Sequence, residues 1–184
     1  MTWSIRTAEP GDAKRLAALG AVLLRQTYEP THPEPTLSEY LASSFAVSSM
    51  ARTLEDPASM ILVVETKESW IGYAELHAGR PTAPTTVLTR TLPGAAPMEI
   101  VRFYVDRLWH GRGVAHDLML ACEEQARMSG CDALWLQAWQ QAAQALRFYT
   151  KEGFDIYGTA VFNFGERADG DLILARGLTA PTLR

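Results

Sequence analysis

The sequence is poor in cysteine and lacks long apolar runs. Of its 184 residues only 2 are cysteines, Cys122 and Cys131, and neither stands at metal-ligand spacing from the 4 histidines. We therefore expect two reduced thiols rather than a disulfide, and no metal. No apolar run approaches the ~20 residues needed to span a bilayer, and the first residues lack the pattern of a signal peptide. These absences predict a cytoplasmic protein without a membrane partner.

Basic residues are not in excess either. The chain has 17 Lys and Arg residues against 21 Asp and Glu residues, which gives a formal net charge of −4 at pH 7. Because nucleic-acid binding needs a basic surface, we expect no nucleic-acid partner. What the chain does have is the composition of an ordinary globular protein, 47% hydrophobic and 21% charged. Its length fits one domain spanning residues 1–184.

Apolar periodicity and turn residues predict an alternation of strands and helices. Near the N-terminus we expect Asp12 to cap a helix that runs to about Thr27. A proline-rich loop should follow, and the capping box Thr36-Leu37-Ser38-Glu39 should begin a second helix. The segment 79–97, rich in proline and threonine, should form a surface excursion with a brief extended piece at Val87-Leu88. The other expected elements are strands at 3–8, 60–66, 70–78, 99–105, 133–139, 155–163 and 171–175, and helices at 47–54, 114–129 and 141–151. This order is typical of an α/β domain with a mixed sheet.

The most informative segment is His110-Gly111-Arg112-Gly113-Val114-Ala115, which joins a strand to an amphipathic helix. In that helix apolar residues recur every four positions from Val114, which places them on one face. Two glycines at a helix start leave backbone N–H groups free, with no side chain to block a close approach. Because the helix dipole is positive at this end, the turn predicts a site for an anion such as a pyrophosphate.

Two nucleotide-binding motifs do not fit this turn. A Walker A loop needs Gly-Lys followed by Ser or Thr, whereas the chain has Gly113-Val114-Ala115. A dinucleotide fingerprint needs a third glycine, and position 116 is His. It also needs an acidic residue at the end of the next strand, where Gln137-Ala138-Trp139 stands. A glycine turn alone is a weak signal, and a second block of sequence strengthens it.

That second block is Ala142-x-x-Ala145-x-x-Phe148-Tyr149-x-x-x-Gly153-Phe154. It resembles the Asn-x-x-Ala-x-x-Phe-Tyr-x-x-x-Gly-Phe signature of the GCN5-related N-acetyltransferase (GNAT) superfamily. The glycine turn resembles the same superfamily's acetyl-CoA-binding motif, Gln/Arg-x-x-Gly-x-Gly/Ala. Over residues 97–176 the pattern is most similar to the spermine/spermidine (polyamine) acetyltransferase branch. The resemblance implies an α/β (α+β) fold, with a mixed, mostly antiparallel sheet of six to seven strands, a parallel central pair that splays, and flanking helices.

The resemblance also implies the reaction. An acetyl group would pass from acetyl-CoA to a primary amine of a small molecule, with a polyamine as the narrower candidate, by direct attack in a ternary complex. Phe103 and Val105 would contribute backbone contacts, with the Val105 N–H near the acetyl carbonyl. The implied cofactor-binding residues are Phe103, Tyr104, Val105, His110, Gly111, Arg112, Gly113, Val114, Ala115, Ala142 and Tyr149.

Two positions depart from the superfamily's pattern. Position 110 is His instead of Gln or Arg, and a histidine can still donate a hydrogen bond to a phosphate. Position 142 is Ala instead of the Asn whose side chain helps to hold the pantetheine arm. Losing one hydrogen bond costs roughly 0.5–1.5 kcal/mol. We therefore expect weakened cofactor binding, or replacement of the missing amide by water or a neighbouring side chain.

Proton transfer needs a base for the amine and an acid for the sulfur. Only about one alkylamine molecule in a thousand is neutral at neutral pH, so a general base or a water relay would speed the attack. Glu99 is the first candidate for this base, although an exposed carboxylate at a strand start explains it equally well, and Glu75 is the reserve. Tyr149 is protonated at neutral pH, and we predict that it protonates the leaving thiolate.

The sequence leaves the acetyl acceptor and the oligomeric state open. The same chemistry could act on a protein N-terminus, a lysine or an amine drug, and a domain without catalysis could instead sense acyl-CoA. Nothing in residues 10–57 decides between these acceptors. Trp139, at the end of its strand, is the tryptophan that we expect at the edge of a substrate cleft. Members of the superfamily often form dimers, and a homodimer that pairs the late strands is open for this chain.

Overall fold

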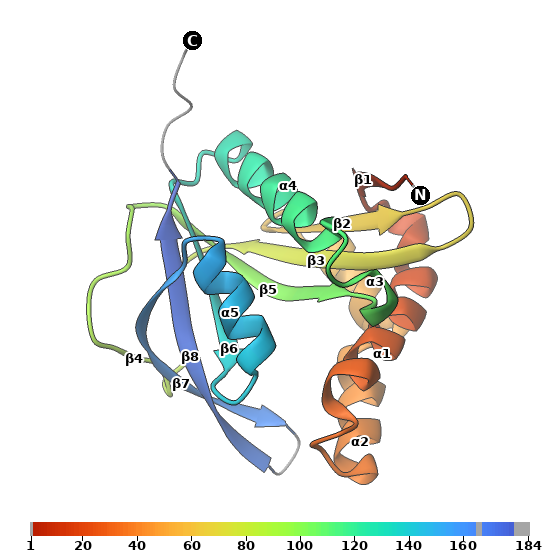
Figure 1. The fold of residues 1–184 in the computed structure, drawn as a ribbon, viewed down its shortest axis with the longest axis horizontal. Coiled ribbons are helices and arrows are strands. Elements are labelled where there is room, and N and C mark those ends of the chain that lie inside the picture. The colour runs from red at the N-terminus through yellow and green to blue at the C-terminus, as the bar shows by residue number, and fades with distance from the viewer. Residues whose placement is uncertain (1, 165–166, 179–184) are drawn as a thin grey trace.

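A mixed sheet with helices on both faces dominates the computed structural model, which describes residues 2–164 and 167–178 (Figure 1). The sheet order is β1-β2-β3-β5-β6-β8-β7-β4, and β5 and β6 form its parallel pair. The strands are β1 (Ser4–Thr7), β2 (Ser59–Glu65), β3 (Trp70–Ala78), β4 (Val87–Leu88), β5 (Pro97–Val105), β6 (Ala133–Trp139), β7 (Asp155–Phe164) and β8 (Arg167–Gly177). The helices are α1 (Ala13–Tyr28), α2 (Glu34–Ser44), α3 (Val47–Glu55), α4 (Val114–Met128) and α5 (Ala143–Lys151), with short 3-10 helices η1 (Pro10–Asp12) and η2 (Arg107–Trp109). The predicted fold class, mostly antiparallel with a parallel central pair, is confirmed.

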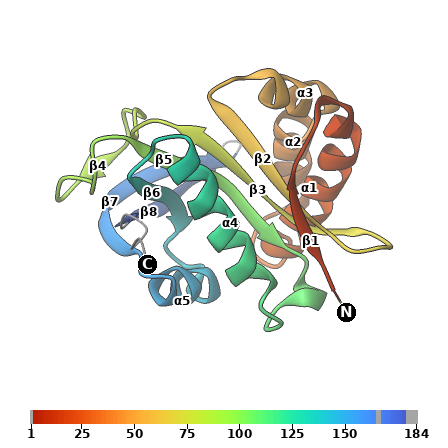
Figure 2. The same cartoon turned by 90° about the horizontal axis from the view of Figure 1, so that it is seen from above.

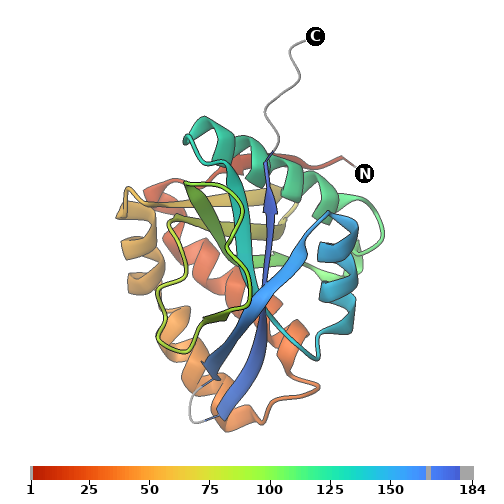
Figure 3. The same cartoon turned by 90° about the vertical axis from the view of Figure 1, so that its left-hand side faces the viewer.

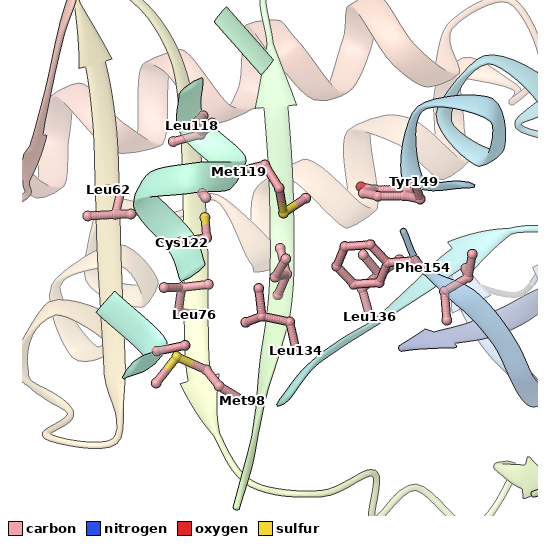
Figure 4. Close-up of a cluster of buried hydrophobic side chains, with 14 of the residues drawn as sticks. Leu62, Leu76, Met98, Leu118, Met119, Cys122, Leu134, Leu136, Tyr149 and Phe154 are labelled. Atoms are coloured by element: carbon pink, nitrogen blue, oxygen red, sulfur yellow. The ribbon is translucent and has the colours of Figure 1, made fainter. Parts of the chain in front are cut away.

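The helices form two layers, one on each face of the sheet (Figure 2). α1, α2 and α3 cover one face, which we call the α1 face, where Leu16 and Tyr73 belong to a buried cluster. α4 and α5 cover the other face, the α4 face, over a second buried cluster (Figure 4). The apolar residues predicted to share one face of α4 all lie in this second cluster: Val114, Leu118, Cys122 and Ala126. The period-four pattern therefore identified the buried side of α4 correctly.

The predicted start of α1 is confirmed, whereas the predicted start of α2 is wrong. Asp12 lies in η1, where its carboxylate accepts from the backbone N–H of Glu9 at 2.9 Å and from Arg6 at 2.7 Å. Asp12 is the N-cap residue of α1, as predicted, but its side chain makes no cap hydrogen bond to the helix. α2 begins at Glu34, ahead of the expected capping box, with Pro35 in its first turn. A proline fits there because first-turn N–H groups have no intrahelical partner to lose.

The excursion between β3 and β5 adds a strand that the resemblance did not imply. Val87 and Leu88 form β4, which pairs antiparallel with β7 at Gly158 and Thr159 and brings the described sheet to eight strands. The expected extended piece at these two residues is confirmed. Leu92 packs with a third cluster around Trp135, so the excursion covers the α1 face of β6, β8 and β7 (Figure 3). The excursion thereby forms one side of the cavity described below.

Candidate active site

The two parallel strands at the centre of the sheet separate after a short paired stretch. Their register ends with Glu99 of β5 opposite Trp135 of β6. β5 continues to Val105 and β6 to Trp139, and Figure 1 shows the two strands diverging. We call this divergence the splay. Along it the facing backbone groups of β5 and β6 are not paired with each other, which leaves donors and acceptors for a ligand.

The glycine turn leads from the splay into α4. Gly111 and Gly113 have φ angles of 73° and 95°, in the left-handed region that glycine adopts without strain. Gly113 is the N-cap of α4 and its helix has no side-chain cap, so the first N–H groups lack a partner within the helix. A Cβ at either glycine would meet nothing within 4 Å. Backbone conformation, and not crowding, therefore requires glycine here, and an anion can approach these N–H groups closely.

His110 connects the turn to β5 and α5. Its Nε2 lies 2.8 Å from the carbonyl oxygen of Val105, and since a carbonyl only accepts, Nε2 carries the hydrogen. Nδ1 then accepts from Nε2 of Gln144 at 3.2 Å. Both ring nitrogens are thus engaged by the protein, and a contact with phosphate would replace one of these bonds. The hydrogen bond from His110 to Val105 fixes the end of β5 relative to the turn.

Ala142 is the N-cap of α5 and provides no side-chain cap. Gln144, two residues further on, brings an amide to this end of α5 through its bond to His110. The sequence offered no signal for Gln144, because the motif places its amide at position 142. A neighbouring amide therefore lies beside the turn where the superfamily's asparagine is missing.

The other residues of the turn differ in how far their side chains are exposed. Arg112 is exposed, and its guanidinium lies 5.5 Å from the ring centroid of Trp109. Val114 is fully buried in the core beneath α4, and Ala115 is half-buried. Val114 can therefore serve a ligand only through its backbone, whereas the Arg112 side chain is able to move toward one.

Tyr149 packs from α5 against the splay. Its ring meets Phe103 of β5 edge-on with centroids 6.3 Å apart, and Phe148 stacks on Phe103 at 5.6 Å. The side chain is 8% exposed, and its hydroxyl end points toward β5 (Figure 4). Burial raises the pKa of Tyr149 well above its ordinary value, so the hydroxyl keeps its proton throughout the physiological range. The site thus holds a neutral phenol against the strand that borders the splay.

Alternation along β5 sends neighbouring side chains to opposite faces. Phe103 and Val105 pack with the α4-face cluster, whereas Tyr104 packs with the α1-face cluster near Tyr73, at a centroid distance of 5.8 Å. Tyr104 therefore lies across the sheet from Tyr149. Of these predicted cofactor residues, Tyr104 can reach a ligand on the α4 face through its backbone alone.

Glu99 lines a cavity at the base of the splay. The cavity has a volume of about 410 Å³, and its wall includes His77, Arg80, Trp135 and Gln137. It lies on the α1 face, because Trp135 alternates with residues of the α4-face cluster along β6. Burial, and to a lesser degree the charge of Glu75, raises the pKa of Glu99 to about 7. This carboxyl group can therefore exchange a proton near neutral pH.

Glu75, the reserve candidate for the base, is paired with a positively charged side chain. It is 7% exposed and forms an ion pair with Arg102. No ion pair to Glu99 occurs among the described residues. Glu99 is therefore the better placed of the two to accept a proton, and the sequence had ranked them in the same order.

Two absences hold for the described part of the chain. Residues 2–164 and 167–178 contain no cluster of three or more His, Cys, Asp or Glu side chains able to hold a metal ion. No helix among them has both the length and the apolar character needed to cross a membrane.

Comparison with known proteins agrees with this geometry. The family described as Acetyltransferase (GNAT) matches residues 21–154. An uncharacterized N-acetyltransferase of Mycobacterium tuberculosis is 28% identical over 167 residues, covering 91% of this chain and 98% of the relative. These matches include both the glycine turn and the block around Tyr149.

Solved structures share the fold at low sequence identity. A PaiA N-acetyltransferase from Thermoplasma acidophilum, in complex with coenzyme A, superposes with a TM-score of 0.74 at 16% identity, over 96% of this chain and 99% of the other. A GCN5-related N-acetyltransferase from Rhodopseudomonas palustris gives a TM-score of 0.71 at 19% identity over 97% of each chain. The ribosomal-protein-S18-alanine N-acetyltransferase of Escherichia coli gives 0.65 at 13% identity, over 100% of this chain and 99% of the other.

Proposed function

Because this chain belongs to the GNAT acetyltransferase family, we propose that it transfers the acetyl group of acetyl-CoA to a primary amine of a small molecule. One observation carries the proposal above the others. The splay between β5 and β6 joins a face that holds the glycine turn and Tyr149 to a face that holds the cavity at Glu99. Two substrates can therefore meet through the sheet.

The residues at the turn and along the splay fit acetyl-CoA. The N–H groups from Gly111 to Ala115 would bind the pyrophosphate, and the open space at both glycines leaves room for it. The unpaired backbone of β5 would bind the pantetheine arm. The Thermoplasma acidophilum relative, which has the same fold, was solved with coenzyme A and supports this assignment. When bound, the cosubstrate would supply the acetyl group as a thioester.

In this proposal the two proton-transfer residues act from opposite faces. An ammonium loses two protons as it becomes an amide. Glu99 would accept one of them, directly or through water, before the amine attacks. The other leaves to solvent as the new C–N bond forms and the C–S bond breaks. Tyr149 would donate its phenolic proton to the departing sulfur and regain one from water.

A polyamine is the narrower acceptor that we propose. The pattern over residues 97–176 resembles the polyamine branch, and the two free cysteines are compatible with the reducing cytoplasm, where polyamines occur. Protein acceptors carry less support, since the Escherichia coli relative that acts on a ribosomal protein shares only the fold.

Release of free thiol tests the proposed function. We expect purified protein mixed with acetyl-CoA to release thiol at a rate that depends on an added primary amine. Equilibrium binding of acetyl-CoA should be measured in parallel. Binding of acetyl-CoA without turnover on any amine of a broad panel would contradict the enzyme and favour an acyl-CoA sensor.

Replacing Glu99 with Gln tests the base. In the wild-type protein the rate should fall below about pH 7, because Glu99 becomes protonated there and can no longer accept a proton. In Glu99→Gln this inflection should vanish, and the rate at pH 8 should drop at least about tenfold. The measurement is kcat/KM for one amine from pH 5.5 to 9.

The exposed Glu68, in the turn between β2 and β3, provides the matched control. Glu68→Gln makes the same chemical change away from the cavity and should leave the profile untouched. An inflection near pH 7 that survives in Glu99→Gln would rule out Glu99 as the base.

A further inference from the structure

A row of polar residues crosses the sheet at the level of Glu99. Glu99 of β5 is the register partner of His77 of β3, and His77 is in turn the partner of Ser59 of β2. Leu76 and Ile100, which precede His77 and follow Glu99, belong to the α4-face cluster. Because side chains alternate along a strand, His77 and Glu99 both lie on the α1 face. The row therefore joins the proposed base to the start of β2.

His77 and Glu99 are neighbours in the wall of one cavity. Both line the cavity of about 410 Å³ at the base of the splay. Residues directly opposite each other in an antiparallel pair have Cβ atoms about 5 Å apart. Among the residues that the structure describes, no direct hydrogen bond joins the imidazole to the carboxyl group. At this separation one water can bridge the two groups, so a proton can pass from Glu99 to His77 through that water.

The Nε2 atom of His77 faces a second carboxylate. It lies 3.7 Å from Oδ2 of Asp56, in the turn between α3 and β2. The backbone N–H of Ala58 and the hydroxyl of Ser59 donate to Asp56 at 2.9 Å and 3.0 Å and hold the pKa of its carboxyl group below the ordinary value. An ionised carboxylate therefore stands beside Nε2 at neutral pH. The His77 side chain is 43% exposed, so a proton on Nε2 can also reach bulk water, and within the described chain Nδ1 forms no hydrogen bond.

The other charged residues near this row are already engaged. Glu75, two residues before His77 on the same side of β3, forms an ion pair with Arg102. Arg80, in the cavity wall, donates from Nη2 to two backbone carbonyl oxygens, and an arginine keeps its proton throughout the physiological range. Histidine is the residue type that gains and loses a proton near neutral pH. Among the described residues that line the cavity, His77 is therefore the one suited to exchange protons with Glu99.

We propose that His77 carries to solvent the proton that Glu99 takes from the acceptor amine. This inference rests on the proposed acetyl transfer and adds a residue to its proton path. Between turnovers the Glu99 carboxyl group gives its proton to a bridging water, and that water passes a proton to Nδ1 of His77. Nε2 then releases its own proton to water beside Asp56, and the neutral ring regains its starting tautomer by exchange with solvent. Only protons move in this step, and each group ends in its starting charge state.

Chemical rescue tests the inference on the full chain. At saturating acetyl-CoA and amine in dilute buffer, His77→Ala should release thiol at least about tenfold more slowly than the wild-type protein. Added imidazole should restore the rate to within about threefold of the wild-type value, because free imidazole can enter the vacated space and carry the proton. Thiol release without protein is subtracted, and the wild-type rate should not respond to imidazole. An undiminished rate in His77→Ala, or a diminished rate that imidazole fails to raise, would overturn the inference.

Two further variants separate proton transfer from other roles of the side chain. His77→Gln keeps a group that hydrogen-bonds to water but cannot exchange a proton near neutral pH, so it should be as slow as His77→Ala. A wild-type rate in His77→Gln would show that hydrogen bonding suffices and would contradict the relay. His116→Ala makes the same chemical change on α4, outside the cavity, and its rate should not depend on imidazole. A gain there equal to that of His77→Ala would also refute the assignment.

The proposed function is judged separately, by the wild-type protein. Absence of thiol release from it with every amine would contradict acetyl transfer, and the inference with it. Release that substitution of His77 leaves unchanged would preserve acetyl transfer and overturn the inference alone. The affinity for acetyl-CoA and the melting temperature should be the same in both His77 variants as in the wild-type protein, since the side chain is half-exposed and lies on the face opposite the glycine turn.

Discussion

Gly113→Glu should strongly weaken the binding of acetyl-CoA, lowering its affinity by at least about 30-fold. Gly113 has a φ of 95°, which costs a residue with a side chain ~1–2 kcal/mol, so the turn would rearrange and redirect its N–H groups. The new carboxylate would also stand at the start of α4, where a bound pyrophosphate would repel it by a further ~1–3 kcal/mol. Together these effects amount to about 2–5 kcal/mol, or roughly one and a half to three and a half powers of ten in affinity. Calorimetric titration with acetyl-CoA or coenzyme A measures the loss directly.

Gly130→Glu is the matched control for this substitution. Gly130 follows the other end of α4, also has a positive φ, of 76°, and also has nothing within 4 Å of an added Cβ. The two variants therefore impose similar backbone strain and the same charge at opposite ends of one helix. We expect Gly130→Glu to bind acetyl-CoA as the wild-type protein does. Full binding by Gly113→Glu would mean that the turn is not the pyrophosphate site.

Tyr149→Phe should lower kcat by about 10²- to 10³-fold while leaving the affinity for acetyl-CoA within about twofold. Phenylalanine keeps the ring that packs against Phe103 and removes only the hydroxyl that points toward β5. The variant should therefore fold normally and lose only a proton donor. Steady-state thiol release with a good amine acceptor gives kcat, and titration gives the affinity.

Tyr157→Phe offers the same chemical change on another strand, β7. Tyr157 lies on β7, where the guanidinium of Arg90 covers its ring at 3.7 Å. Its substitution should leave kcat unchanged. If Tyr149→Phe turned over as fast as Tyr157→Phe, the thiolate would take its proton from water, and Tyr149 would be a packing residue.

The conformation of the glycine turn and the helix around Tyr149 were predictable because their sequence signals are local. Glycines just ahead of a helix with period-four apolar residues predict a tight turn from neighbouring residues alone. The structure places Gly111 and Gly113 in the positive-φ conformation that this turn needs. The block around Tyr149 likewise lies within one helix and the residues that follow it. One contact was still not predicted, because the hydrogen bond from Gln144 to His110 joins residues 34 positions apart in the sequence.

The contacts on the α1 face could not be assembled from the sequence. The rings of Tyr28 and Trp139 come within 6.4 Å, centroid to centroid, only because the end of α1 lies near the end of β6, and no periodicity records that approach. One signal was available in Asp169 and Asp171, two acidic residues that alternate on one side of a strand. Alternation placed them on a single face, yet it could not show that His32, far away in the sequence, contacts Asp169. For a related reason the side chain of Asp12 makes no cap hydrogen bond to α1, because it accepts from Arg6 instead.

The division of the site by the sheet separates two kinds of evolutionary change. In the proposed function the turn and α5 bind the cosubstrate on the α4 face, whereas the cavity at Glu99 lies on the α1 face. Under that proposal, substitutions in the cavity wall, at Arg80 or Gln137, would alter the preferred amine while the acetyl donor stays the same. A redesigned acceptor specificity should start from these two positions, with the glycine turn left unchanged.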